Sequence, residues 1–130
     1  MCDILVVGSM NMDLVVQTDR CPDKGETIIG NNFSQIPGGK GANQGLAVGK
    51  LGGNVSFIGS CGTDAFGDRL LESLQTGGVE TSDVFRVEES TGIASIIIEA
   101  DGDNRIIVVQ GANKELTVNK INSLEGKIKE

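Results

Sequence analysis

Residues 37–44 read PGGKGANQ, a glycine-rich break that passes directly into a predicted helix. From Lys40 to Leu51 apolar residues recur at helical spacing, and the pair Gly52-Gly53 ends the pattern. Three glycines in four residues let backbone amides approach a ligand closely, at the positive end of the helix dipole. The spacing alone leaves two interpretations open: a turn that binds a polyhydroxy compound, and a flexible hinge with a solvated lysine.

Strand-like and helical segments alternate on both sides of this stretch. The aliphatic run Ile4–Val7 is typical of a strand buried on both faces. Further strands are predicted at Leu14–Val16, Thr27–Gly30, Val55–Ile58, Val84–Val87, Ile93–Ala100 and Arg105–Val109. A second helix is capped by Asp64 and stopped by Gly77-Gly78, and Thr117 caps a last helix that continues to Ile128. This order predicts an α/β fold with an additional small β element.

Polar side chains follow the first predicted strand. Residues 8–13 read GSMNMD, and ligands of open α/β sheets bind at such strand ends. Asn11 and Asp13 can each accept a hydroxyl proton, and a carboxylate makes the stronger bond. The alternative is that Asn11 caps a turn and Asp13 is solvated. The glycine-rich turn at residues 59–67 is interpreted as structural, with Cys61 as a small buried hydrophobe.

Composition excludes several classes of function. The chain carries 11 Lys and Arg against 18 Asp and Glu, a net charge of −7, so neither nucleic acid nor a membrane surface is expected as a partner. Histidine is absent, which excludes Ser-His-Asp catalysis and imidazole zinc sites, and no metal site is predicted. Three widely spaced cysteines indicate reduced thiols. With no leader and no long apolar run, we expect a cytoplasmic protein.

Two nucleotide-binding patterns fail at residues 37–44. A Walker loop needs glycine four residues before the Gly-Lys pair and Ser or Thr after it, but Ser34 and Gly41 occupy those positions. A dinucleotide fingerprint needs glycine where Gln44 stands.

An ordered set of short motifs resembles the ribokinase-like (PfkB-type) family of carbohydrate kinases, and the PGGKGANQ stretch resembles its ribokinase branch. The other members of the set are residues 8–13, Pro22 with Gly25-Glu26-Thr27, residues 59–67, Gly77-Gly78-Val79, Thr91-Gly92 and Gly111-Ala112-Asn113. The resemblance implies the N-terminal part of a three-layer α/β sandwich with a small β-sheet lid. The core would comprise residues 1–13, 37–91 and 111–130, and the lid residues 14–36 and 92–110.

The resemblance also implies roles for single residues. The sugar hydroxyls would be held by Asn11 and Asp13, and the pocket completed by Gly39, Lys40, Gly41 and Asn43. The catalytic base of the family is an Asp in a Gly-Ala-Gly-Asp-type motif, which we expect beyond Glu130; the ATP, Mg²⁺ and monovalent-cation sites lie there too. We therefore expect residues 1–130 alone to bind none of these cofactors and to be inactive.

Three interpretations of the chain follow. The first is the sugar-binding and lid portion of a kinase that phosphorylates ribose or a similar sugar at a primary hydroxyl, associating as a homo-oligomer through the lid or an exposed sheet edge. The second is a non-catalytic sugar-binding or dimerisation module. The third is one half of a split kinase.

Two glycines lie inside the helix predicted from Lys40 to Leu51. Gly45 and Gly49 each lower the stability of this helix by about 1 kcal/mol relative to Ala.

Overall fold

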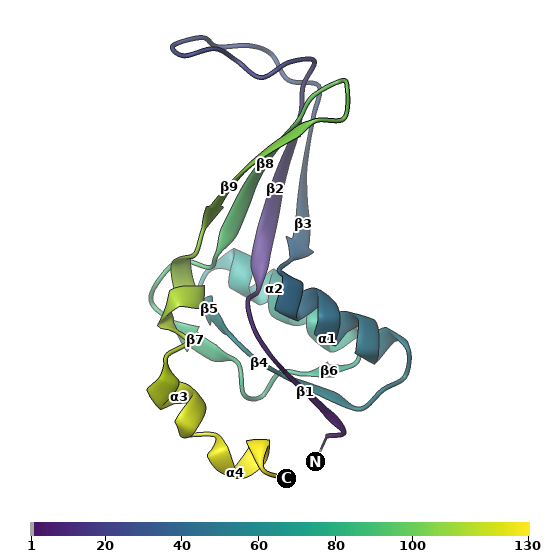
Figure 1. The fold of residues 1–130 in the computed structure, drawn as a ribbon, viewed down its shortest axis with the longest axis vertical. Coiled ribbons are helices and arrows are strands. Elements are labelled where there is room, and N and C mark those ends of the chain that lie inside the picture. The colour runs from purple at the N-terminus through teal and green to yellow at the C-terminus, as the bar shows by residue number, and fades with distance from the viewer. Residues whose placement is uncertain (1) are drawn as a thin grey trace.

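Three separate β-sheets and two longer helices make up the computed structural model, which describes residues 2–130 (Figure 1). The strands are β1 Ile4–Val7, β2 Asn11–Gln17, β3 Asn32–Gly38, β4 Val55–Ile58, β5 Ser60–Gly62, β6 Val79–Glu80, β7 Phe85–Val87, β8 Ile93–Ile98 and β9 Asn104–Val109. The helices are α1 Lys40–Lys50, α2 Ala65–Thr76, the 3₁₀ helix η1 Gly111–Glu115, α3 Val118–Asn122 and α4 Glu125–Ile128. The predicted α/β class is confirmed. Within residues 2–130 no helix is both long and apolar enough to cross a bilayer.

The first sheet has the order β1-β4-β6, with all strands parallel. Helices α1 and α2 pack against it, as the short strands require for burial of their apolar side chains. The prediction that β1 is buried on both faces is wrong, because Ile4 and Val7 are each 44% exposed. The reason is that β1 lies at the sheet edge, where it pairs with β4 alone.

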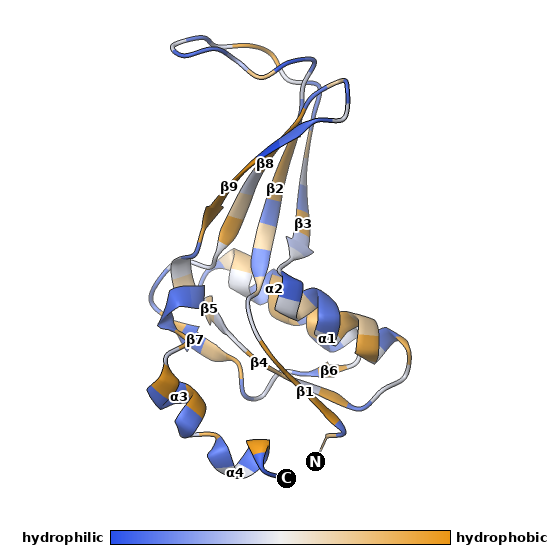
Figure 2. Cartoon of the chain, in the orientation of Figure 1, coloured by the Kyte–Doolittle hydropathy of each residue, from blue (hydrophilic) through white to orange (hydrophobic). Residues whose placement is uncertain are grey.

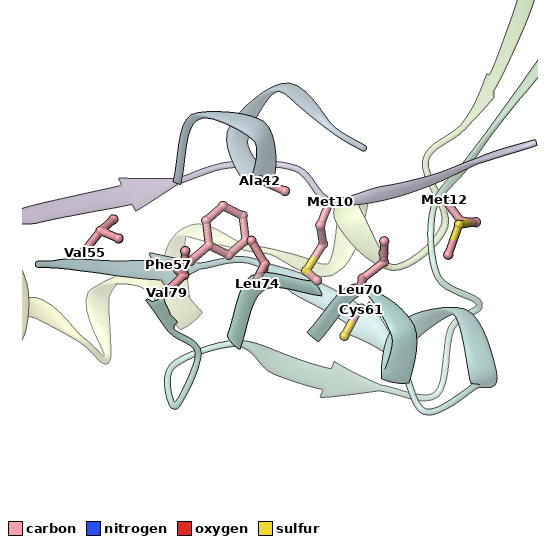
Figure 3. Packing of buried hydrophobic residues seen from close by; sticks show 9 residues of the cluster. All are labelled: Met10, Met12, Ala42, Val55, Phe57, Cys61, Leu70, Leu74 and Val79. Atoms are coloured by element: carbon pink, nitrogen blue, oxygen red, sulfur yellow. The ribbon is translucent and has the colours of Figure 1, made fainter. Parts of the chain in front are cut away.

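The core lies between this sheet and the two helices (Figure 3). Phe57 of β4 and Met10, just before β2, are fully buried there. Helix α1 presents small residues to the core, whereas α2 presents Leu70 and Leu74. Small side chains let α1 approach the sheet closely, which brings its first turn to the end of β1.

The second sheet has the order β3-β2-β8-β9 and projects away from the helices (Figure 1). Strands β2 and β8 are parallel, and β8 and β9 form the predicted hairpin with Gly102 in its turn. Both termini lie at the opposite end of the molecule from this projection (Figure 1). The hairpin turn also brings carboxylate oxygens of Glu99, Asp101 and Asp103 within 4.8 Å of one another.

Two expectations about the segment that leads into α1 are wrong. The structure has no strand at Thr27–Gly30, and the chain instead pairs with β2 along Asn32–Gly38. The break expected at Pro37-Gly38-Gly39 begins only at Gly39, because Pro37 and Gly38 lie inside β3. An edge strand tolerates proline, since one side of its backbone needs no hydrogen-bond partner.

The C-terminal helix is divided in two, contrary to the single helix that its apolar spacing predicts. The predicted cap is confirmed, since Thr117 Oγ1 accepts from the Lys120 N–H. Ser123 then donates its hydroxyl to the Lys120 carbonyl at 2.5 Å, and α3 ends at Asn122. Such a side-chain bond competes with helix continuation, which α4 resumes at Glu125.

The two glycines inside α1 differ in what surrounds them. A methyl group on Gly45 would lie 3.6 Å from Phe57, which is ordinary contact. A methyl group on Gly49 would overlap the carbonyl oxygen of Gly77. Close packing of α1 on the end of α2 therefore requires glycine at position 49. Of the two glycines, only Gly45 lowers helix stability relative to alanine without a compensating contact.

We expect Gly45→Ala to raise the free energy of unfolding by about 0.5–1 kcal/mol, because alanine restricts the unfolded chain and favours the helix. Gly49→Ala should lower it by about 1–3 kcal/mol, because the added methyl group must push two backbone segments apart. Denaturant titration of both variants measures the difference. Equal effects in the two variants would contradict the packing described here.

Candidate functional site

The first turn of α1 lies directly on the link between β1 and β2. A methyl group on Gly41 would approach Gly8 Cα to 2.8 Å, and the Ala42 N–H donates to the Ser9 carbonyl at 3.0 Å. Gly39 has φ +98°, and a methyl group there would come within 2.8 Å of Met10 Cα. Glycines are thus required at this junction for space, and at position 39 for backbone conformation as well.

Asp13 lies on β2 beside this junction. A methyl group on Gly38 would lie 2.7 Å from Asp13 Oδ2, so the carboxylate rests against the turn that starts α1. Its neighbours across the sheet are Ile36 and Ala94. Burial raises the pKa of Asp13, and no hydrogen bond formed by residues 2–130 has its carboxylate as acceptor. A half-buried carboxylate with a free acceptor is suited to bind a hydroxyl group.

Asn11 lies at the start of β2, two residues before Asp13, so both side chains leave the same face of the strand. Its Oδ1 accepts from Asn113 Nδ2 at 2.6 Å. A methyl group on Gly92 would stand 2.6 Å from the same oxygen. The end of β1, the start of α1 and η1 therefore meet around the Asn11 amide and the Asp13 carboxylate.

Lys40 and Asn43 lie on the first turn of α1, and both are exposed. Within residues 2–130 no hydrogen bond or ion pair joins either of them to Asn11 or Asp13. The structure thus brings the half-buried pair on β2 to the start of α1, and it has Lys40 and Asn43 exposed on the first turn of that helix. The binding roles of all six predicted residues stay predictions.

A second hydrogen-bonded cluster joins α2 to the start of β8. Asp64 caps α2 by accepting from the Gly67 N–H at 2.9 Å, which confirms the predicted cap. It also accepts from the Thr91 N–H at 2.9 Å and from Thr91 Oγ1 at 2.5 Å. Burial acts to raise the pKa of Asp64, but these three hydrogen bonds outweigh it and hold the pKa below its usual value. The cluster thereby fixes the residues that lead into β8.

We expect Asp64→Ala to lower the free energy of unfolding by about 2–4 kcal/mol, because a helix cap and two further bonds are lost. Since the folded-state pKa lies below the unfolded value of about 3.9, this contribution is present above that pH and disappears as the pH falls through the folded-state pKa. Urea titrations between pH 3 and pH 7 test this. A constant difference between wild type and variant across that range would contradict it.

Asn113 is a residue of this region to which the sequence assigned no role. Its side chain contacts Met10 and Asn11, more than a hundred residues earlier in the chain. It stands in the Gly111-Ala112-Asn113 motif, but nothing in local spacing indicates what it contacts.

The expectation that Cys61 is a small buried hydrophobe is confirmed. Cys61 is fully buried, and burial raises the pKa of its thiol to about 11.

A cavity of about 680 Å³ opens between α1 and α2, away from the site just described. Its walls include Gly49, Arg69 and Gly78, and none of the six predicted residues lines it. The candidate site is therefore defined by side-chain chemistry at the junction of β2 and α1.

Comparison with known proteins identifies the class to which this fold and junction belong. The profile of the pfkB family carbohydrate kinases matches residues 1–130, and the chain belongs to that family. Among its members, the chain is 46% identical over 131 residues to the ribokinase of Lactococcus lactis subsp. lactis (strain IL1403) and 43% identical over 126 residues to that of Bacillus subtilis (strain 168).

Solved structures agree with this assignment. The ribokinase from Giardia lamblia is similar with a TM-score of 0.85 and 34% identity, covering 97% of this chain and 39% of that one. Arabidopsis thaliana ribokinase, complexed with ribose and ATP, gives 0.80 and 41%, covering 86% and 37%. The two bacterial ribokinases are likewise covered over 43% of their length each. The chain thus corresponds to the N-terminal portion of its relatives. The structural similarity confirms the predicted fold, which is the N-terminal part of a ribokinase-like α/β fold.

Proposed function

We propose that residues 1–130 form the sugar-binding part of a carbohydrate kinase that phosphorylates ribose or a similar sugar at a primary hydroxyl. The observation that carries this proposal is the half-buried carboxylate of Asp13, which accepts no hydrogen bond from residues 2–130 and rests against Gly38 with Asn11 on the same strand face. A relative of 41% identity is described in complex with ribose and ATP, which supports a ribose-like ligand.

The chemistry of the junction suits a polyol. An ionised Asp13 accepts strongly from a hydroxyl group, and an asparagine amide both donates and accepts. The exposed Lys40 and Asn43 at the first turn of α1 add further donors on the solvent side. The four-stranded sheet would cover the bound sugar as a lid that excludes water.

Two backbone amides in the first turn of α1 are already occupied and do not offer themselves to a nucleotide phosphate. The Ala42 N–H is bonded to the Ser9 carbonyl and the Asn43 N–H to the Gly39 carbonyl, so these two amides are not free to bind phosphate oxygens. The family resemblance instead implies ATP, Mg²⁺ and monovalent-cation sites in the part of the relatives that residues 1–130 do not cover. The residues described here would accordingly hold and orient the sugar.

Titration calorimetry with D-ribose tests the proposal. We expect saturable binding by the 130-residue chain and an affinity lowered about 3- to 10-fold in Lys40→Ala, because one hydrogen-bond donor is removed. Lys50→Ala, which changes an exposed lysine at the other end of α1, is the matched control and should bind as the wild type does. Absence of ribose binding, or equal losses in both variants, would contradict a pocket at the start of α1.

We also propose that residues 1–130 alone do not transfer phosphate. A coupled assay with ATP, Mg²⁺ and ribose should show no turnover above that of Lys40→Ala. Restoration of turnover by an added nucleotide-binding polypeptide would favour the split-kinase interpretation. Turnover by the chain alone would overturn the proposal.

We propose further that two copies associate through the four-stranded sheet. Hydrophobic residues lie along β8 and β9 (Figure 2). Apolar side chains of the sheet are exposed, among them Phe33 at 55%, Ile107 at 69% and Val108 at 57%. Sedimentation equilibrium should therefore show a dimer, and Ile107→Lys should shift it toward monomer. A wild-type chain that remains monomeric at high concentration would contradict this association.

A further inference from the structure

The side chain of Asn113 ties η1 to the link between β1 and β2. Its Oδ1 accepts from the Met10 N–H at 3.0 Å, and its Nδ2 donates to the Met10 carbonyl at 3.1 Å. The same Nδ2 donates to Asn11 Oδ1 at 2.6 Å. Asn113 thus forms three hydrogen bonds with two consecutive residues of the candidate site.

These bonds fix the orientation of both amides. A backbone N–H can only donate, so the Asn113 atom that faces Met10 N is the oxygen. The other end of the amide is then the nitrogen, which has no acceptor capacity, and the Asn11 atom that faces it must be Oδ1. The orientation of Asn113 is therefore set by backbone, and Asn113 in turn sets the orientation of Asn11.

The surroundings leave this pair little freedom to turn over. Met10 is fully buried, and Asn113 is half-buried. A methyl group on Gly92 would overlap Asn113 Nδ2 and would approach Asn11 Oδ1 to 2.6 Å, so the start of β8 packs directly on both amides. Glycine at position 92 is what gives the pair its space.

We propose that Asn113 is a positioning residue that occupies the oxygen of Asn11 and so leaves the Asn11 NH₂ group to donate to a sugar hydroxyl. This inference rests on the proposed function. Asp13, on the same face of β2, would accept from a neighbouring hydroxyl. The site would then recognise two hydroxyl groups through one donor and one acceptor of fixed polarity.

Asn113→Asp tests the inference, because it keeps the shape and the acceptor for the Met10 N–H but removes the NH₂ group that donates to Asn11 and to the Met10 carbonyl. The amide of Asn11 is then free to turn its NH₂ group toward position 113. We expect ribose affinity by calorimetry to fall about 10-fold. In an Asn11→Ala background the same change should lower affinity by less than about 2-fold, because its effect passes through Asn11. Asn119→Asp, a matched change at an exposed position, should have no effect.

Hydrogen exchange of side-chain amides, measured by NMR on the unaltered chain, reports the orientation of the Asn113 and Asn11 amides without a variant and without sugar. The Asn113 NH₂ protons should exchange slowly, and those of Asn11 fast until ribose is added. Fast exchange at Asn113, or an equal affinity loss on Asn113→Asp in both backgrounds, would overturn the positioning role. Absence of ribose binding by the unaltered chain would instead overturn the proposed function and the ligand named here, while the exchange pattern still decides the orientation.

Discussion

Asp13→Asn is expected to weaken ribose binding about 10- to 150-fold, because a hydrogen bond to an ionised carboxylate is replaced by one to a neutral amide. The variant keeps the size of the side chain beside Gly38, so the fold should be retained. Calorimetry on the variant gives the affinity, and circular dichroism checks the fold.

The pH dependence of binding offers an independent check on the same carboxylate. Burial raises the pKa of Asp13, so protonation removes the ionised acceptor at a higher pH than for an ordinary aspartate. Ribose affinity of the wild type should fall as the pH drops through this raised value, whereas Asp13→Asn should be insensitive there. The same shift lowers stability as pH rises from the unfolded pKa of about 3.9 to the raised value. Asp3→Asn, a matched change at an exposed position, is the control and should bind ribose as the wild type does. If Asp13→Asn bound ribose with wild-type affinity, the proposed role of the carboxylate would be refuted.

Gly41→Ala is expected to lower the free energy of unfolding by about 1–3 kcal/mol and ribose affinity about 10-fold. The added methyl group would stand 2.8 Å from Gly8 Cα and 2.9 Å from Ser9 N, so α1 must move away from the end of β1. That movement separates the helix start from Asn11 and Asp13, which lie just beyond the same link.

Gly45→Ala is the matched control, since it makes the same substitution one turn further along α1 where a methyl group has room. It should leave ribose affinity unchanged. Urea unfolding and calorimetry on both variants separate a local effect at the junction from a general effect on the helix. Equal affinities in the two variants would show that the contact of α1 with Gly8 does not shape the site.

Much of this fold could be predicted because its signals are local. The start of α1, the capping of α2 by Asp64 and the hairpin turn at Gly102 each depend on a few neighbouring residues. The sequence placed Asn11 and Asp13 together after the first strand, whereas the structure has both on β2, where strand alternation puts them on one face.

The remaining features depend on partners distant in the sequence. Strand β3 begins at Asn32 because it pairs with β2, so its local propensity at Thr27–Gly30 was misleading. The exposure of β1 follows from its edge position, which the aliphatic run at Ile4–Val7 does not encode. The contact of Asn113 with Asn11 joins residues 102 apart, and no local pattern indicates it.

A titration with D-ribose in which NMR follows the backbone amides of the chain shows where the sugar binds. The site predicts saturable shifts that cluster at Met10–Asp13 and Gly38–Asn43. Shifts confined to the cavity between α1 and α2, or no shifts at all, would contradict a sugar site at the junction of β2 and α1.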